Sequence, residues 1–374
     1  MRNISFISGT RADYGKIKPY IDFLVQQKDT KVFVFITGMN MLKKYGSTYK
    51  HIQKDLKKNC TIILDKKFQE LGAALEMAHI IQAFDNHLKK EEISFVFVHG
   101  DRPEVLAASS TAVLNNIPVC HIEAGDLSGS VDELIRHATS KLASRFLVAD
   151  KQAEQILLQL GEERTSIHIT GNSSLSFLIN PPTPKETAQL NQIKNYGILL
   201  YHPVTTLKKS VLKKEAVTLM QQLEITQKEY IVIAPNNDLG SDIILKTYQQ
   251  YQHNKKFHFF KSLSFEAFNY ALKNADFLVG NSSCGIKEAP FYGVPVINIG
   301  CRQNNRFQHL MLKNFYHLDS PDNLSDVISK IKKSTTEKRT INYREDLFKK
   351  LESIFTEEFF NAKIQKPFQK ISLK

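Results

Sequence analysis

Charged side chains follow two neighbouring apolar runs in the first half of the chain, where they could carry acid–base chemistry. One run ends in His99-Gly100-Asp101-Arg102 and the next in His121-Ile122-Glu123-Ala124-Gly125-Asp126. Ligands of open parallel sheets bind outside the carboxyl ends of the strands, so we expect Asp101 and Glu123 to project into one crevice. Carboxylates that meet there repel one another, and environments that separate their pKa values produce a general acid and a general base.

A third carboxylate, Asp132, begins a helical pattern that carries Arg136 and His137 on its next turn. We add Asp132 to the catalytic candidates because a helix that follows the second run can bring it to the same crevice. A structural interpretation stays open for each single carboxylate. Asp132 could be a favourable charge at a helix N-terminus, and Asp101 could cap a loop.

Two turns rich in small residues are candidates for anion binding. Ser8–Gly15 joins the first apolar run to a helical pattern, so backbone N–H groups and the Arg11 guanidinium group could face an anion. A tight turn with a surface arginine explains this segment equally well, since it matches neither a dinucleotide fingerprint nor a P-loop. Gly280–Glu288 also joins a strand to a helix and predicts a cradle for a diphosphate, in which Glu288 could accept both ribose hydroxyl groups.

His202 belongs to a further segment of this kind, Tyr201-His202-Pro203-Val204-Thr205-Thr206, which leaves a strand and enters a helix. At the edge of a sheet an imidazole can serve as acid, base or hydrogen-bond donor to a phosphate. The alternative is a structural histidine.

These residues must be positioned by alternating strands and helices. Short runs rich in β-branched and aromatic residues recur, each followed by a longer stretch with helical spacing, which is typical of parallel sheets with crossover helices. The predicted strands are Ile4–Ile7, Val32–Ile36, Thr61–Leu64, Ser94–Val98, Pro118–His121 and Phe146–Val148, and then Ile198–Tyr201, Tyr230–Ala234, Phe257–Phe260, Asp276–Val279 and Val294–Asn298. Two doubly wound α/β units fit this series better than one large sheet.

The segment Asn180-Pro181-Pro182-Thr183-Pro184 separates the two series of strands. Proline lacks an N–H group and disrupts helices, so the segment predicts an exposed, non-helical connector. We therefore predict a first domain at residues 1–180, a second at 185–350, and a C-terminal segment at 351–374.

The composition is that of an ordinary soluble globular protein, with 374 residues, 42% hydrophobic and 24% charged. The net charge of +12 suits nucleic acid, an anionic membrane or a negatively charged small substrate. Most of the lysines lie outside the motifs, so we expect the positive charge to reflect the composition of the surface. We therefore expect neither nucleic acid nor a membrane as partner. Four scattered cysteines and the lack of a long apolar stretch favour a cytoplasmic protein without a metal or a disulfide framework.

Eight motifs, in order from about residue 1 to residue 306, together resemble the UDP-N-acetylglucosamine 2-epimerases. More narrowly, they resemble the hydrolysing branch that makes N-acetylmannosamine for sialic acid synthesis. The motifs are Gly9-Thr10-Arg11-Ala12-Asp13, Thr37-Gly38-Met39, His99-Gly100-Asp101-Arg102, His121-Ile122-Glu123-Ala124-Gly125, Ile135-Arg136-His137, Tyr201-His202-Pro203-Val204-Thr205, Gly280-Asn281-Ser282-Ser283 and Arg302-Gln303-Asn304-Asn305-Arg306.

The resemblance implies a glycosyltransferase-B architecture, with two Rossmann-like domains facing across a cleft and a C-terminal helix that crosses back to the first domain. It implies catalytic roles for Asp101, Glu123, Asp132 and His202. UDP is expected mainly on the second domain, and the residues implied in binding it are Arg11, Ser282, Ser283, Gly285 and Glu288. The possible substrate contacts are Arg102, Arg136, His137 and Arg302.

The implied reaction has two steps and needs no cofactor. Removal of the C2 proton and departure of UDP give 2-acetamidoglucal; addition of water at C1 with a proton on the other face of C2 then gives N-acetylmannosamine. One carboxylate takes a proton, another delivers one, and cationic groups stabilise the leaving diphosphate. No metal is implied, and NAD is not implied because the dinucleotide fingerprint is missing. A homo-oligomer, dimer or tetramer, is expected by analogy.

The chain departs from the family pattern at two positions, and several alternatives stay open. Glu123-Ala124-Gly125-Asp126 stands where relatives often have Glu-Gly-Gly-Glu, which leaves the role of Asp126 open, and Gly171-Asn172-Ser173-Ser174 lacks an expected aspartate. The alternative functions are hydrolytic epimerisation of UDP-N,N′-diacetylbacillosamine for legionaminic acid, a non-hydrolysing UDP-N-acetylglucosamine 2-epimerase, and a glycosyltransferase of the same architecture.

Overall fold

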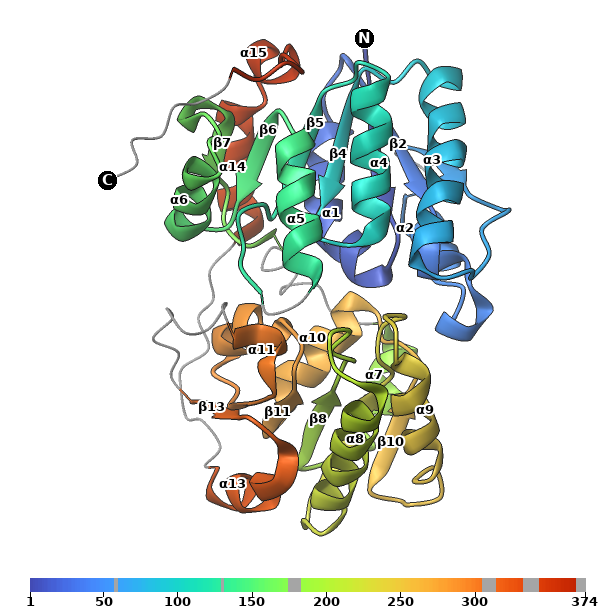
Figure 1. Ribbon diagram of the computed structural model, residues 1–374, viewed down its shortest axis with the longest axis vertical. Coiled ribbons are helices and arrows are strands. Elements are labelled where there is room, and N and C mark those ends of the chain that lie inside the picture. Colours follow the sequence, from blue (N-terminus) through green and yellow to red (C-terminus); the bar gives the residue numbers. More distant parts are fainter. Residues whose placement is uncertain (57–59, 129–130, 174–182, 305–313, 332–342, 368–374) are drawn as a thin grey trace. The chain divides into compact units, whose positions relative to one another are not determined.

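The computed structural model describes residues 1–56, 60–128, 131–173, 183–304, 314–331 and 343–367 (Figure 1). The chain divides into two compact units. Unit 1 contains Met1–Asp126, Asp132–Phe177 and Asn342–Lys374, and unit 2 contains Leu127–Val131 and Leu178–Ile341.

Unit 1 is built on a parallel sheet with the strand order β3-β2-β1-β4-β5-β6-β7. The strands are β1 (Arg2–Ser8), β2 (Thr30–Ile36), β3 (Thr61–Leu64), β4 (Phe95–His99), β5 (Val119–Ile122), β6 (Arg145–Val148) and β7 (Ile167–Ile169). The helices are α1 (Arg11–Leu24), α2 (Tyr49–Leu56), α3 (Ala73–Lys90), α4 (Pro103–Leu114), α5 (Val131–Leu142), α6 (Lys151–Gln159), α14 (Tyr343–Ile354) and α15 (Glu357–Phe360).

Both faces of this sheet are buried, which explains why its strands are apolar nearly throughout. In β2, Phe33 and Phe35 belong to one hydrophobic cluster, whereas Val32, Val34 and Ile36 belong to another. The alternation follows from the period of two residues in a strand. The first cluster is completed by residues of α3, α4 and α6, and the second by residues of α1, α2 and α14.

Unit 2 repeats the arrangement with the strand order β10-β9-β8-β11-β12-β13, all in parallel. Its strands are β8 (Tyr196–Leu200), β9 (Glu229–Ile233), β10 (Phe257–Phe260), β11 (Phe277–Gly280), β12 (Val296–Ile299) and β13 (Phe315–Leu318). Its helices are α7 (Pro184–Leu190), α8 (Lys209–Glu224), α9 (Ser241–Gln249), α10 (Phe265–Asn274), α11 (Cys284–Lys287) and α13 (Leu324–Lys330). The predicted α/β class, with two Rossmann-like domains, is confirmed.

The first strand of each sheet marks the point where the strand order reverses. β1 lies between β2 and β4, and β8 lies between β9 and β11. In doubly wound sheets the connections on the two sides of such a point lead to opposite faces and leave a crevice at the carboxyl ends. The segments after β1 and β4 in unit 1, and after β8 and β11 in unit 2, are therefore where ligands are expected.

The structure differs from the sequence-based expectations in three places. β7 and β13 were not predicted, and both are short edge strands. The sequence predicts a non-helical connector, yet α7 begins at Pro184, because proline lacks only an N–H group that the first turn of a helix does not use; residues 180–182 lie outside the described part. α14 begins at Tyr343 and belongs to unit 1, whereas the predicted second domain extends to residue 350.

The reason for the early return to unit 1 is the apolar face of α14. Its Leu347 and Leu351 are buried in the same cluster as Phe23 of α1 and Phe97 of β4, and Phe359 and Phe360 of α15 extend that cluster. Over the described residues, no helix combines the length and the apolar character needed to cross a bilayer.

Candidate active site

The site in unit 1 begins with the turn between β1 and α1. Thr10 and Asp13 form a capping box: the Thr10 hydroxyl group accepts the N–H of Asp13 at 3.1 Å, and the Asp13 carboxylate accepts the N–H of Thr10 at 3.0 Å. The box satisfies two N–H groups at the start of α1 and fixes the direction of the helix. Arg11 is thereby placed as the first helical residue, half-buried, and Lys16 one turn further along.

Glu123, the residue directly after β5, has a strained backbone conformation. Its φ angle is +57°, in the left-handed region that costs a non-glycine residue roughly 1–2 kcal/mol. Two residues later Gly125 has a φ of +74°, and a Cβ atom there would lie 2.2 Å from the carbonyl oxygen of Ala153. The chain is thus forced into this turn, and strain of this kind concentrates at functional sites.

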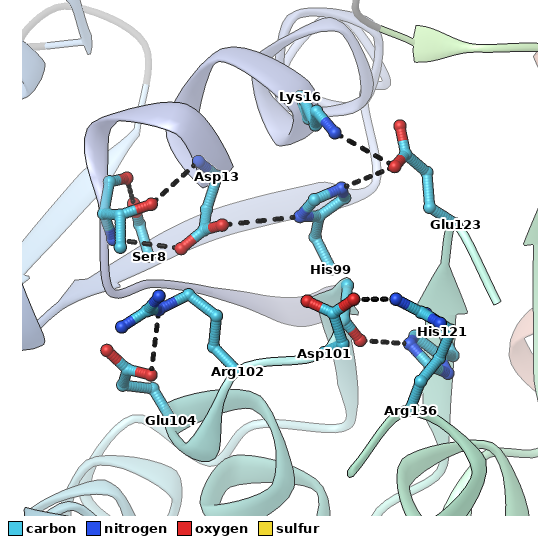
Figure 2. A network of polar contacts seen from close by, with 12 residues as sticks. Ser8, Asp13, Lys16, His99, Asp101, Arg102, Glu104, His121, Glu123 and Arg136 are labelled. Atoms are coloured by element: carbon cyan, nitrogen blue, oxygen red, sulfur yellow. Dashed lines mark hydrogen bonds and ion pairs between the residues drawn. The ribbon is translucent and has the colours of Figure 1, made fainter. Parts of the chain in front are cut away.

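The carboxylate of Glu123 is held by two side chains from other elements (Figure 2). The ammonium group of Lys16 donates to Glu123 Oε2 at 3.1 Å, and His99 Nε2 lies 3.4 Å from the same oxygen. On its other side the His99 ring meets Asp13, with 3.7 Å between Nδ1 and Oδ1. Asp13, His99 and Glu123 are all buried, so their charges must be balanced within this network.

The electrostatics of Asp13 show how the balance works. Burial by itself would raise the pKa of this carboxyl group, but the neighbouring His99, the positive charge of Arg102 and the Thr10 hydroxyl group outweigh it and lower the pKa below its usual value. Asp13 is therefore a permanent negative charge at neutral pH.

Asp101, in the turn after β4, forms an ion pair with Arg136 of α5. Arg136 also donates to the backbone carbonyl of Asp126 at 2.7 Å, and it is only 1% exposed. The sequence suggested Arg136 as a possible substrate contact; in the structure its guanidinium group supports Asp101 and the turn after Glu123. Asp101 itself is partly exposed.

A neutral histidine supports the same turn. His121 Nε2 donates to the carbonyl oxygen of Gly100 at 2.7 Å, and its Nδ1 accepts from the Ser140 hydroxyl group at 3.0 Å. Burial lowers the pKa of His121 to about 4, so the ring carries no charge at neutral pH and its tautomer is fixed by these two bonds. The Asp101 turn thus rests on a rigid, uncharged support.

Arg102 lies beside Glu104 of α4, with 3.4 Å between Nε and Oε2. Glu104 is buried against the turns after β1 and β2, where a Cβ atom on Gly9 or on Gly38 would come within 2.8 Å of its Oε1. Burial raises the pKa of Glu104, although the charge of Arg102 opposes the shift. The absence of side chains at Gly9 and Gly38 leaves the room that the Glu104 carboxyl group occupies.

Asp132 lies in the first turn of α5, four residues before Arg136, and is half-buried. Residues four apart share a face of a helix, so Asp132 is on the side of α5 that carries Arg136. His137 is half-buried as well, and its Nε2 lies 4.0 Å from Oε1 of Glu133 on the same helix. Burial lowers the pKa of His137.

Three residues of the network were given no role by the sequence: Asp13, Lys16 and His99. Asp13 and His99 lay inside recognised motifs, and the position of His99 as the last residue of a strand was a usable signal. Lys16 carried no such signal, because its partner Glu123 is 107 residues away in the chain.

In unit 2 the strands at the reversal point approach very closely. Gly280 ends β11 with a φ of +141°, and a Cβ atom there would lie 2.0 Å from the carbonyl oxygen of Leu200 in β8. The next residue, Asn281, is fully buried and joins the two segments by a reciprocal pair of bonds. Its Oδ1 accepts the N–H of His202 at 2.7 Å, and its Nδ2 donates to the His202 carbonyl at 2.9 Å.

The ring of His202 is oriented by a further contact. Its Nδ1 accepts the backbone N–H of Asn236 at 3.1 Å, which places the proton of the neutral ring on Nε2. The Arg302 guanidinium group is directed to the same region: it donates to the carbonyl oxygen of Asn281 at 3.4 Å and lies 3.9 Å from Asp238. A histidine donor and an arginine therefore accompany the turn after β11.

Ser282 and Ser283 are half-buried in that turn, and α11 follows. The Ser282 hydroxyl group accepts the N–H of Cys284 at 3.4 Å. A Cβ atom on Gly285 would come within 2.9 Å of Val296, so the helix packs closely on β12. Glu288 is buried at the end of α11. Burial of Tyr292 raises the pKa of that side chain, and the charge of Glu288 adds to the shift.

Each unit thus gathers polar side chains at the carboxyl ends of its central strands. Unit 1 offers paired carboxylates suited to proton transfer, and unit 2 offers hydroxyl, imidazole and guanidinium donors suited to an anion. Within the described ranges, no three or more His, Cys, Asp or Glu side chains are grouped so that they could hold a metal ion.

Comparison with known proteins gives one consistent answer. Residues 23–353 match a family described as UDP-N-acetylglucosamine 2-epimerase. A protein of Neisseria meningitidis serogroup B named UDP-N-acetylglucosamine 2-epimerase is 39% identical over 337 residues, which cover 88% of this chain and 87% of that protein. A UDP-N,N′-diacetylbacillosamine 2-epimerase (hydrolyzing) of Legionella pneumophila is 33% identical over 313 residues, with 82% and 83% of the two chains covered.

The fold has solved counterparts. The crystal structure of a UDP-GlcNAc 2-epimerase of Methanocaldococcus jannaschii, in complex with UDP-GlcNAc and UDP, superimposes with a TM-score of 0.78. The two sequences are 20% identical, and the match covers 94% of this chain and 99% of the other. At this identity the likeness concerns the fold.

Proposed function

Since the chain belongs to the UDP-N-acetylglucosamine 2-epimerase family, we propose that it acts by the hydrolysing reaction, converting UDP-N-acetylglucosamine and water to N-acetylmannosamine and UDP. The observation that carries this proposal is the pair of carboxylates at adjacent strand ends, each with its own cation: Asp101 with Arg136, and Glu123 with Lys16. Two such carboxylates can take a proton from C2 and return one to its other face.

In the first step one carboxylate removes the proton from C2 of the sugar. The electron pair of that bond forms the C1–C2 double bond, and the bond between C1 and the diphosphate oxygen breaks, releasing UDP and leaving 2-acetamidoglucal. The cations beside Asp101 and Glu123 favour the ionised carboxylates needed for proton removal. Asp132, on the face of α5 that carries Arg136, is the third candidate for proton transfer.

In the second step water adds to C1 and a proton is delivered to the opposite face of C2. We assign the two proton transfers to Glu123 and Asp101, which follow adjacent strands. The carboxylate that received the first proton need not be the one that donates the second.

We assign UDP to the residues of unit 2. His202 Nε2–H and Arg302 are donors for the diphosphate, and the Ser282 and Ser283 hydroxyl groups surround the turn that would hold it. Glu288 is the candidate acceptor for the ribose hydroxyl groups, and Gly285 lets α11 pack closely on β12. Arg11, Arg102 and His137 of unit 1 are the remaining candidates for contacts with the substrate.

A second substrate is favoured by one finding. The Legionella relative, 33% identical, is named for UDP-N,N′-diacetylbacillosamine. The higher identity of the Neisseria relative, 39%, favours UDP-N-acetylglucosamine. The product N-acetylmannosamine would serve sialic acid or a related surface polysaccharide.

The test is incubation with UDP-N-acetylglucosamine in heavy water, followed by NMR of the products. Free N-acetylmannosamine with deuterium at C2 supports the proposal. UDP-N-acetylmannosamine would instead identify a non-hydrolysing enzyme, and turnover only of UDP-N,N′-diacetylbacillosamine would identify the second substrate.

Variants connect the reaction to the site. Glu123→Gln and Asp101→Asn should abolish deuterium incorporation at C2 while UDP still binds. Glu154→Gln is the matched control, because Glu154 is a glutamate of α6 paired with Arg164 at a distance of 2.8 Å, outside this network. If Glu123→Gln turned over as fast as the control, the assignment of Glu123 would be wrong.

A further inference from the structure

His99 is a buried imidazole placed between two carboxylates of the site. It ends β4, its side chain is 6% exposed, and its two ring nitrogens point in opposite directions (Figure 2). Nδ1 lies 3.7 Å from Asp13 Oδ1, and Nε2 lies 3.4 Å from Glu123 Oε2.

The charges around this ring come from two carboxylates and two cations, and the positive charge of Arg102 acts on Asp13. Asp13 is a permanent negative charge, and Glu123 adds a second when it is ionised. Lys16 supplies one positive charge, through its contact of 3.1 Å with Glu123. Buried carboxylates need hydrogen-bond donors, and the His99 ring lies between the two carboxylates.

We propose that His99 is a positioning residue for Glu123: anchored on Asp13, its imidazole holds the Glu123 carboxylate against Lys16 and sets how readily that carboxylate exchanges a proton. The proposal rests on the function proposed above, in which Glu123 exchanges a proton with C2 of the sugar. His99 needs no contact with the substrate for this role.

The position between Asp13 and Glu123 is occupied by the His99 ring. His121 uses both ring nitrogens on Gly100 and Ser140, and burial lowers its pKa to about 4. Lys16 reaches the same Glu123 oxygen as His99, at 3.1 Å. The titratable and charged groups that face the His99 ring from the elements packed against it are Asp13 and Lys16 of α1, Arg102 before α4, His121 of β5 and Glu123 after β5.

With a proton on Nε2, the imidazole donates toward Glu123 Oε2 and stabilises the ionised form of that carboxylate. Its removal therefore raises the proton affinity of Glu123. The limb of the pH–rate profile that reports Glu123 should move to higher pH, whether Glu123 acts as base or as acid.

Two variants distinguish the contact of Nε2 with Glu123 from the contact of Nδ1 with Asp13. In His99→Gln the side-chain amide can reach the place of Nε2 and bond Glu123, whereas in His99→Asn it can reach only the place of Nδ1 and bond Asp13. We expect His99→Asn to lower kcat about tenfold to a hundredfold with little change in KM, and to move the limb upward by about one pH unit. His99→Gln should recover most of kcat. Equal activity of both variants, or equal loss without a shift of the profile, would overturn the proposal.

A readout independent of turnover separates this inference from the proposed function. In ¹⁵N NMR of the full chain, Glu123→Gln should change the Nε2 resonance of His99 and Asp13→Asn its Nδ1 resonance, while Glu154→Gln changes neither. Unchanged resonances would contradict the bridge even in an active enzyme. A wild-type protein without turnover of either UDP-sugar would contradict the proposed function, whatever the resonances show.

Discussion

Arg136 is almost fully buried and forms its ion pair with Asp101, a residue that is itself partly exposed. A buried guanidinium group without a partner is expensive, so we expect Asp101 to contribute to stability in addition to the role in proton transfer proposed above. The contact also joins the turn after β4 to α5, and thereby fixes the carboxylate relative to the Glu123 turn, whose Asp126 carbonyl binds the same arginine.

A double-mutant cycle on this pair should show strong coupling. Arg136→Met should lower the free energy of unfolding by about 1–3 kcal/mol, since it leaves the Asp126 carbonyl and the Asp101 carboxylate without their donor. Asp101→Asn should be less damaging when Arg136 is already Met than in the wild type. Chemical denaturation of the four proteins gives the coupling, expected above about 1 kcal/mol; additive effects would show that the pair is not energetically linked.

Gly280→Ala should be far more damaging than Gly300→Ala. Both residues have positive φ angles, +141° and +71°, so both variants meet the cost of an unfavourable backbone, about 1 kcal/mol. At Gly280 the added Cβ would also meet the Leu200 carbonyl at 2.0 Å, whereas at Gly300 no heavy atom lies within 4 Å. We expect Gly280→Ala to cost at least about 3 kcal/mol; thermal denaturation that gave equal losses would contradict the close approach of β8 and β11.

Acid should destabilise unit 1 through His87 of α3. Burial, with a smaller contribution from Lys90, lowers the pKa of His87 from 6.5 to about 4. The unfolded chain therefore binds a proton below pH 6.5 that the folded protein does not bind until about pH 4. The contribution of neutral His87 to the free energy of unfolding is fully present above pH 6.5. It is lost as the pH falls from 6.5 to about 4, by about 1.4 kcal/mol per pH unit for one such group.

His87→Gln tests this dependence, because an amide can keep the bond to the Ser5 hydroxyl group, 2.9 Å in the wild type, without titrating. Denaturation at several pH values should show the slope reduced by up to one proton. His253→Gln, at an exposed histidine, is the control. A slope unchanged by His87→Gln would place the acid sensitivity elsewhere.

Asn281 should control the backbone of His202. Asn281→Asp keeps an acceptor for the His202 N–H group but loses the donor to its carbonyl, and Asn281→Ala loses both. Hydrogen exchange of the His202 amide should therefore be faster in Asn281→Ala than in Asn281→Asp. UDP binding, measured by calorimetry, should weaken by about tenfold in Asn281→Ala, and unaltered exchange would mean that Asn281 does not hold this segment.

The central strands could be predicted because burial on both faces leaves a continuous apolar run, as in Phe95–His99. The edge strands β3 and β10 were also predicted, but β7 and β13 were not. β7 is only Ile167-His168-Ile169, and β13 is partly exposed along its whole length. The start of α14 at Tyr343, before the predicted boundary at residue 350, escaped prediction for another reason, since the apolar face of this helix would suit either sheet and only the distant partner decides.

The site also contains residues that could be predicted from the sequence and contacts that could not. A position at the carboxyl end of a strand could be predicted from local pattern, and Asp101 and Glu123 lie there. The contacts of Lys16 with Glu123 and of His99 with Asp13 depend on β1 lying beside β4 and β4 beside β5. No local pattern encodes that order, so the network could be seen only in the folded chain.

The packing of α14 and α15 against the first sheet has a consequence for biosynthesis. The ribosome synthesises Ile4 and Phe6 long before Phe359 and Phe360, which lie in the same hydrophobic cluster. Unit 2 has all its strands before those last helices are made. The unit whose synthesis begins first is thus the last to be completed, and until then the apolar residues that α14 and α15 cover, such as Phe97, lack part of their packing and can promote aggregation.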